Sequence, residues 1–89
     1  MHEMGLMNDL LAKIRKIAAD HNAEAVAKVE VRLGALAHIS ESHFKEHFVH
    51  GSRGTLAEGA ELVVRLDTDI HAAGAQDILL ERVEVVEAE

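Results

Sequence analysis

Residues 4–20 read MGLMNDLLAKIRKIAAD, and this stretch decides the first half of the fold. Its apolar residues recur at intervals of three and four: Met7, Leu10, Leu11, Ile14, Ile17 and Ala18. Polar and charged side chains fill the positions between them, which is the pattern of an amphipathic α-helix with one buried face. The basic residues in the later half of the stretch complement the negative carboxyl end of a helix dipole. The sequence therefore predicts a helix over 4–20 that stops near Asn22.

Three later segments have the two-residue period of a half-buried β-strand. Residues 28–33 read KVEVRL, so that Val29, Val31 and Leu33 alternate with charged side chains, and Gly34 ends the segment. Residues 61–66 and residues 78–86 repeat the alternation. We therefore expect three strands.

A second, shorter helix is expected between the first two strands. Ser40 is a favourable residue to cap its amino end, and Gly51 is a favourable stop. Between them, residues 41–50 place Phe44 and Phe48 on one face.

The predicted elements follow the order α-β-α-β-β, and residues 67–77 read as a loop before the last strand. The fold class that this order favours is α+β, with two helices packed on one face of a three-stranded sheet. A length of 89 residues fits one small domain over 1–89. Such a domain has a small core, so self-association as a homodimer would be one way to bury more surface.

Charge and composition exclude several classes of function. The net charge of −7 repels phosphate backbones and anionic membranes, and two aromatic residues leave no stacking platform for bases. Glu3 and Asp9 lie where a signal peptide would be basic, and no apolar run approaches the about 20 residues of a membrane span. We expect a cytoplasmic protein that binds neither nucleic acid nor membrane. With no cysteine there is no disulfide and no cysteine-based zinc site.

Seven histidines are a high number for this length. His43, His47 and His50 are four and three residues apart on the second helix, so they share a face and could either hold a metal or form a solvated surface. His38 and His71 are isolated. The serines occupy cap or turn positions and lack the surroundings of a nucleophile, so we do not expect an enzyme.

The opening Met1-His2-Glu3 is the most informative part of the chain for function. If nothing precedes Met1, its α-amine, the deprotonated His2 amide and the His2 imidazole can close two chelate rings on one metal ion. Three nitrogens in one plane suit Ni(II) or Cu(II), which favour square-planar geometry, better than tetrahedral zinc. Glu3 or a distant histidine, such as His71 or His38, would complete the plane.

The chain resembles the HypA/HybF family of nickel-insertion chaperones. The resemblance rests on Met1-His2-Glu3-Met4, on the helix with Leu11, on Val31-Arg32-Leu33-Gly34 and on the closing segment 78–85. It implies that Met1, His2 and Glu3 bind nickel for the maturation of [NiFe]-hydrogenase. It also implies two partners, the precursor of the hydrogenase large subunit and a GTPase maturation factor.

One departure from the family pattern is large. Members of the family usually carry a zinc ribbon with two Cys-x-x-Cys pairs before the last strand, whereas residues 67–77 contain no cysteine. Zinc is therefore not expected. The leading prediction is a non-enzymatic nickel carrier. The alternatives are an interaction module that has lost metal delivery and a nickel carrier for urease.

Overall fold

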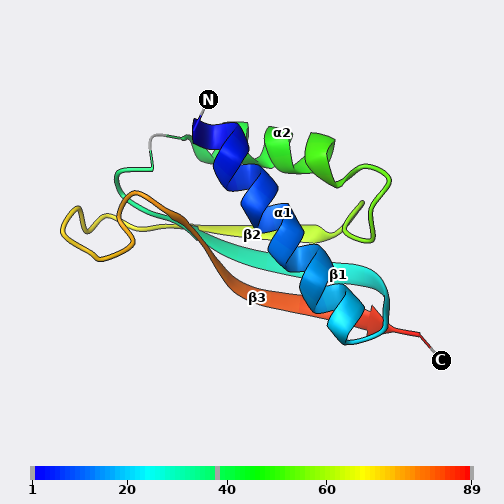
Figure 1. Ribbon diagram of the computed structural model, residues 1–89. Coiled ribbons are helices and arrows are strands. Elements are labelled where there is room, and N and C mark those ends of the chain that lie inside the picture. The colour runs from blue at the N-terminus through cyan, green and yellow to red at the C-terminus, as the bar shows by residue number, and fades with distance from the viewer. Residues whose placement is uncertain (1, 38, 89) are drawn as a thin grey trace.

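The computed structural model describes residues 2–37 and 39–88, with the side chains of residues 2–4 excepted. Five elements follow one another along this part of the chain (Figure 1): α1 (His2–Asp20), β1 (Ala23–Leu33), α2 (Glu41–Ser52), β2 (Glu61–Leu66) and β3 (Ile78–Glu87). The order is the α-β-α-β-β that the sequence predicts. Asn22 adopts a positive φ of 51° in the turn after α1, which confirms that the first helix ends there.

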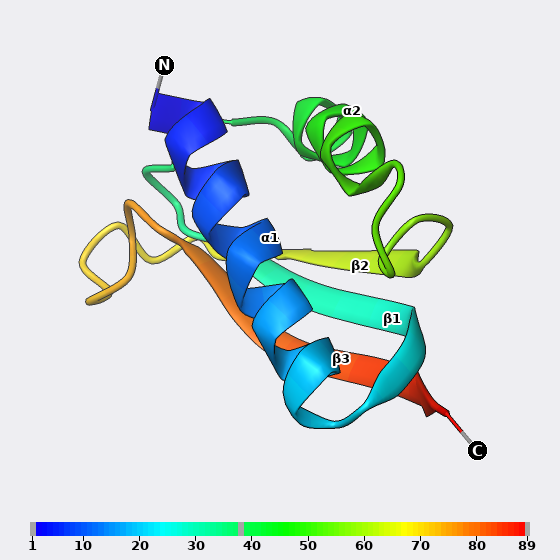
Figure 2. The ribbon, with the colours of Figure 1, turned by 45° about the vertical axis from the view of Figure 1, so that its right-hand side comes forward.

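The three strands form one sheet in the order β2-β1-β3. Strands β1 and β2 run parallel, with Val29 opposite Leu62 and Val31 opposite Val64, and α2 is the crossover between them. Strand β3 lies antiparallel on the other side of β1. Figure 2 shows α1 crossing in front of the sheet and α2 above it. The predicted α+β class, with both helices on one face of a three-stranded sheet, is confirmed.

The core lies between this face and the two helices. Ile14 from α1, Val29 and Val31 from β1 and Phe44 from α2 are fully buried, and Phe48 is 2% exposed. Burial of each such side chain contributes about 1.5–3 kcal/mol. The predicted helical periodicity is confirmed, because the residues of α1 that enter the core are those of the sequence pattern: Met7, Leu10, Leu11, Ile14 and Ala18.

Strand β1 begins at Ala23, five residues before the expected start at 28. The prediction failed there because residues 23–27 are rich in alanine, a residue depleted in strands. The pairing of β1 with β3 also shifts register between Ala23 and Ala25 and again between Val26 and Lys28. Each irregularity breaks the two-residue alternation on which the sequence prediction depends.

The predicted end of α2 at Gly51 is wrong, since the helix continues to Ser52 and its carboxyl cap is Arg53. Gly51 lies inside α2 at a position where α1 leaves no room for a side chain. A Cβ atom at this position would lie 2.5 Å from Cδ1 of Leu11. The predicted cap at the other end is confirmed, because Oγ of Ser40 accepts a hydrogen bond of 3.2 Å from the backbone N–H of His43.

Residues 67–77 carry the chain from β2 at one edge of the sheet to β3 at the other, past the end of β1. The backbone N–H of Gly34 donates to the carbonyl of Asp77 at 2.9 Å, and that of Leu36 donates to the carbonyl of Ala75 at 2.6 Å. A Cβ atom on Gly34 would lie 2.3 Å from the carbonyl oxygen of Ala75. Gly34 is therefore needed for the crossing, and the end of the predicted loop packs against it at Ala75, while residues 68–71 are exposed.

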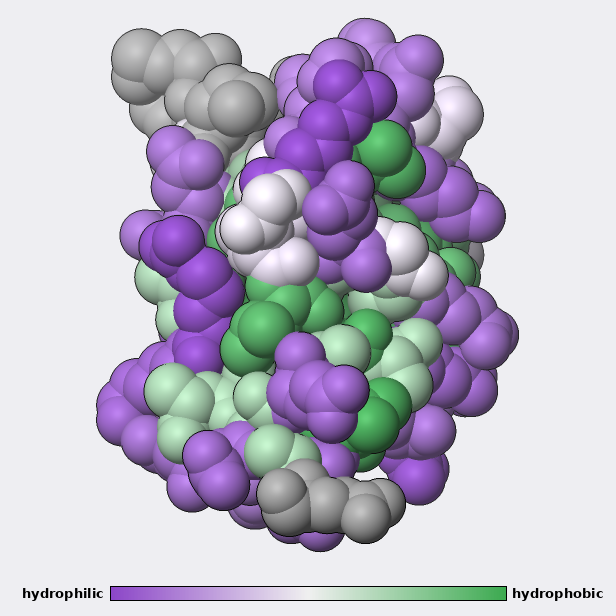
Figure 3. Space-filling view, turned by 90° about the vertical axis from the view of Figure 1, so that its right-hand side faces the viewer, coloured by the Kyte–Doolittle hydropathy of each residue, from purple (hydrophilic) through white to green (hydrophobic). Residues whose placement is uncertain are grey.

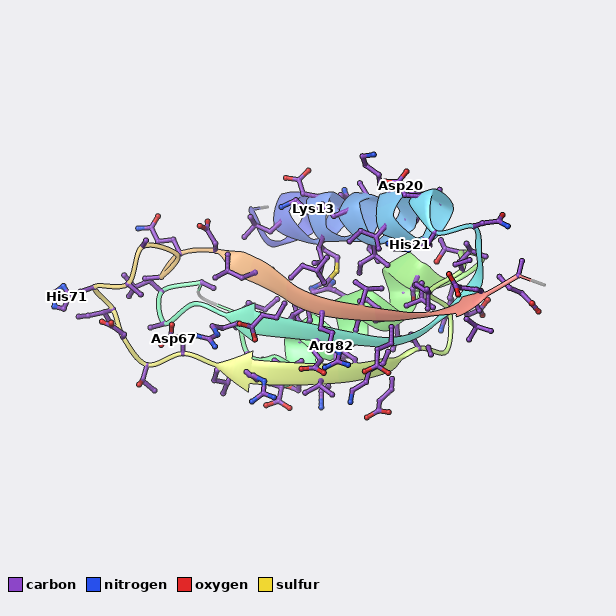
Figure 4. The ribbon with its side chains drawn as sticks, turned by 90° about the horizontal axis from the view of Figure 1, so that it is seen from below. Lys13, Asp20, His21, Asp67, His71 and Arg82 are labelled. Atoms are coloured by element: carbon purple, nitrogen blue, oxygen red, sulfur yellow. The ribbon has the colours of Figure 1, made fainter. Side chains whose placement is uncertain are left out.

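The opposite face of the sheet carries ion pairs. Glu30 lies 3.7 Å from both Lys28 and Arg65, and Glu81 lies 3.1 Å from Arg32 and 4.0 Å from Arg65. Figure 4 shows charged side chains projecting from the side of the sheet that faces away from α1. The side chains of these pairs are between 15% and 60% exposed, so this face is partly solvated and each pair contributes little to stability.

Exposed apolar side chains are spread over the surface. Figure 3 views the side with the turn after α2, where hydrophobic residues gather in the middle among hydrophilic ones. Leu56, which lies in this turn, is 41% exposed, while Ile70 is 54% exposed in the loop 67–77. Among the described residues, no helix is both long enough and apolar enough to cross a bilayer.

Candidate metal centre

The amino end of α1 is the predicted nickel site, and its backbone geometry bears on that prediction. The helix begins at His2. The first four N–H groups of an α-helix have no carbonyl partner inside the helix. The His2 amide is the first of these groups in α1. It can therefore lose its proton to a metal ion without breaking a hydrogen bond of the helix.

The helix dipole also favours binding of a metal ion through anionic ligands at this end. The amino end of a helix carries a partial positive charge of about half an elementary charge. This charge favours anionic ligands at this end of the helix. A divalent cation bound by one amide anion and one carboxylate leaves a complex with no net charge, so the dipole does not repel it.

The first turn of α1 extends beyond the core. Gly5 is exposed, and no atom lies within 4 Å of the position that its Cβ would take, whereas Met7 is 1% exposed. The buried part of the helix therefore holds the end in place from Met7 onward. Met1 and the side chains of His2 and Glu3 lie outside the described residues, so the ligand set remains a prediction from the sequence.

Of the two distant histidines considered as a further ligand, the structure describes one. His71 is exposed in the loop 67–77, and its backbone N–H donates to Oδ1 of Asp69 at 2.9 Å. Figure 4 shows its side chain at the tip of the loop, pointing away from the helices. His38 lies outside the described residues.

The histidines of α2 are the second candidate metal site that the sequence offers. The imidazole rings of His43 and His47 lie with their centroids 5.7 Å apart and their planes tilted by 36°. His50 is exposed one turn later. Among the side chains that the structure describes, which begin at residue 5 and leave out residues 38 and 89, no group of three or more histidine, aspartate and glutamate residues is arranged to enclose a metal ion.

The serine hydroxyls form hydrogen bonds with groups close to them in the sequence. Ser40 caps α2, and the buried Ser52 donates to the carbonyl of Val49 at 3.3 Å. Thr55 in turn donates to the carbonyl of Ser52 at 2.6 Å, which closes the turn after the helix. These contacts are those of helix ends and turns, as the sequence predicts.

Comparison with known proteins assigns the family. The family model described as "Hydrogenase/urease nickel incorporation, metallochaperone, hypA" matches residues 1–74. This range covers α1, β1, α2, β2 and most of the loop before β3. The chain therefore belongs to the HypA family.

Curated relatives agree with this assignment. The chain is 34% identical over 67 residues to "Hydrogenase maturation factor HypA" of Aquifex aeolicus, covering 75% of this chain and 58% of that protein. It is 39% identical over 64 residues to the protein of the same name from Xanthobacter autotrophicus, covering 72% and 57%. The chain thus spans about three fifths of the length of the curated relatives that it matches.

A solved structure has the same fold. The solution structure of the Ni metallochaperone HypA from Helicobacter pylori superposes with a TM-score of 0.79, covering 97% of this chain and 98% of that chain. Sequence identity is 15%, so the superposition supports the fold alone.

Proposed function

We propose that this protein is a non-enzymatic nickel carrier that binds Ni²⁺ at its amino end and delivers it for the maturation of [NiFe]-hydrogenase. Membership of the HypA family is the observation that carries the proposal, because the family description names hydrogenase and urease nickel incorporation. The matched region begins at residue 1 and so includes Met1-His2-Glu3.

In this proposal the three opening residues supply the nickel ligands. The Met1 α-amine, the His2 amide nitrogen and the His2 imidazole lie in one plane around the ion, and the Glu3 carboxylate is the first candidate for the fourth position. The beginning of α1 at His2 supports this arrangement, because the amide concerned has no helical hydrogen bond to lose. A site at an exposed chain end can be approached by a receiving protein.

The proposed recipient is the precursor of the hydrogenase large subunit, and a GTPase maturation factor is the proposed partner in loading. Relatives named "Hydrogenase maturation factor HypA" favour this recipient. Urease is the second candidate recipient, because the family description names both enzymes. We place the activity in the cytoplasm, where the protein would act without binding nucleic acid or a membrane.

Zinc is not part of this proposal. The chain has no cysteine, so the two Cys-x-x-Cys pairs of a zinc ribbon are missing. We propose that 1–89 forms a nickel-binding domain in which the loop 67–77 stands in place of the ribbon. The hydrogen bonds from Gly34 and Leu36 to this loop support the proposal that it connects β2 to β3 without a zinc ribbon.

An interaction module is the competing proposal. In that case the protein, as a monomer or a homodimer, would dock on the maturation machinery without carrying metal, and Met1-His2-Glu3 would have no role. The test is hydrogenase maturation in cells that express the His2→Ala variant. Full maturation by this variant would favour the interaction module over the nickel carrier.

Nickel titration tests the carrier directly. We expect untagged protein with a free Met1 amine to bind one Ni²⁺ with the absorbance of a planar d⁸ ion, and the His2→Ala variant to lose that absorbance. His21→Ala is the matched control, since His21 is exposed in the turn after α1 and outside the predicted site. Equal planar absorbance in His2→Ala and wild type would overturn the proposal.

A further inference from the structure

Two histidines on α2 occupy a position that the proposed function does not use. His43 and His47 are four residues apart, so they project from one side of the helix on successive turns. Their ring centroids are 5.7 Å apart. Two imidazoles in adjacent positions of one six-coordinate metal ion place their centroids about 4.5 Å apart, because each ligating nitrogen lies about 2 Å from the metal. The observed spacing is about 1 Å wider, so the two rings must turn toward each other to bind one ion.

Packing of α2 against the core determines which side of the helix carries His43 and His47. Each histidine directly precedes a phenylalanine of the core, Phe44 or Phe48, and these two rings are 0% and 2% exposed. The contact between Gly51 and Leu11 of α1 fixes the same helix one turn after His47. Neither rotation nor sliding of α2 is possible without breaking these contacts. The fold therefore holds the two imidazoles on one side of the same helix.

The charges on α2 also suit a cation. Lys45 is the only lysine or arginine within α2, and it lies about 200° around the helix from His43, given 100° per residue. Its ammonium pairs with Glu41 at 3.0 Å. Glu46 is next to His47 in the chain and one turn after His43, so its negative charge is local to the pair. Imidazole nitrogens are ligands that nickel, copper and zinc accept, while Mg²⁺ prefers oxygen.

We propose that His43 and His47 form a second Ni²⁺ site, weaker than the one at the amino end, with water in the remaining coordination positions. The two sites differ in electronic state. A deprotonated amide with two further nitrogens in its plane makes a planar, diamagnetic d⁸ ion, whereas two imidazoles and several waters make a six-coordinate, paramagnetic one. Nickel at the α2 site is held by two protein ligands only, so it exchanges readily with solvent or with another chain.

The test separates this site from the one at the amino end. Protein with an acetylated Met1 amine, which removes that nitrogen donor, is titrated with NiCl₂ and followed by equilibrium dialysis. The imidazole resonances are followed by NMR. We expect one bound Ni²⁺ per chain and paramagnetic broadening of the His43 and His47 signals. The His47→Ala and His43→Ala variants should lose at least about tenfold in affinity, as expected for removal of a ligand.

His50→Ala and His71→Ala are the matched controls, and both should bind Ni²⁺ within twofold of the blocked parent protein. Circular dichroism confirms that each variant retains its helices. Absence of Ni²⁺ binding to the blocked protein, or binding that survives the loss of both His43 and His47, would overturn the second site. Neither result would affect the site at the amino end, which is tested by the planar absorbance of the unblocked protein.

Discussion

Gly34→Ala is the most incisive test of how the loop 67–77 is held. The added Cβ would lie 2.3 Å from the carbonyl oxygen of Ala75 and 2.4 Å from that of Gly74. Both obstacles are backbone atoms, so no side chain can rotate away. The loop must move, and its hydrogen bonds from Gly34 and Leu36 are then weakened or lost.

The expected destabilisation follows from these contacts. Overpacking of this kind costs about 1–3 kcal/mol, and each lost hydrogen bond costs about 1 kcal/mol. Since the clash can be relieved at the expense of the hydrogen bonds, the combined loss in the free energy of unfolding is about 2–4 kcal/mol. For a domain of this size that corresponds to a fall in Tm of about 10–25 °C.

Urea unfolding followed by far-ultraviolet circular dichroism is the suitable assay, because the chain has no tryptophan or tyrosine to report by fluorescence. Gly5→Ala is the matched control. It makes the same chemical change in α1, where the new Cβ meets no atom within 4 Å, so it should stabilise by up to about 1 kcal/mol. A Gly34→Ala protein within about 0.5 kcal/mol of wild type would refute the reasoning about the loop crossing.

Three further results are expected. Phe44→Ala should cost about 3–5 kcal/mol in urea unfolding, because the ring is fully buried between the helices and the sheet, and a loss under 1 kcal/mol would contradict that placement. Ser40→Ala should cost about 1 kcal/mol by removing the cap of α2, whereas Ser42→Ala should cost less than half as much, because it removes only the 3.3 Å contact with Oγ of Ser40 and leaves the bond from the His43 N–H in place. Nickel affinity should fall as the pH is lowered, because imidazole ligands bind metal only in their neutral form, and an affinity that does not change as the pH is lowered would argue against histidine ligation.

Elements with a regular apolar period could be predicted from the sequence. Helix α1 and strand β2 are predictable because their apolar residues repeat in the sequence at helical or strand intervals. The start of β1 could not be found, since its irregular pairing with β3 destroys the two-residue period over residues 23–27. The role of Gly51 could not be found either. Glycine commonly ends a helix, and only the position of Leu11 in space explains its presence inside α2.

Some features of the candidate metal sites could likewise be predicted from the sequence, and others required the structure. The chemistry of the adjacent residues Met1-His2-Glu3 predicts a ligand set for Ni(II) or Cu(II) without knowledge of the fold, and the family resemblance selects nickel. The pairing of His43 with His47 follows from helical spacing, but the separation of their rings required the structure. The packing of the loop 67–77 against Gly34 depends on a contact between residues distant in sequence, and no local pattern signals it.

Nickel binding by the unmodified protein and by the same protein with an acetylated Met1 amine is the most direct measurement of the central claim. Acetylation removes one nitrogen donor and leaves every side chain unchanged. The account predicts that the acetylated protein lacks the planar d⁸ absorbance and binds its first Ni²⁺ at least about 100-fold more weakly, as expected when a ligand that anchors the chelate is lost. The same absorbance and the same affinity in both proteins would contradict it.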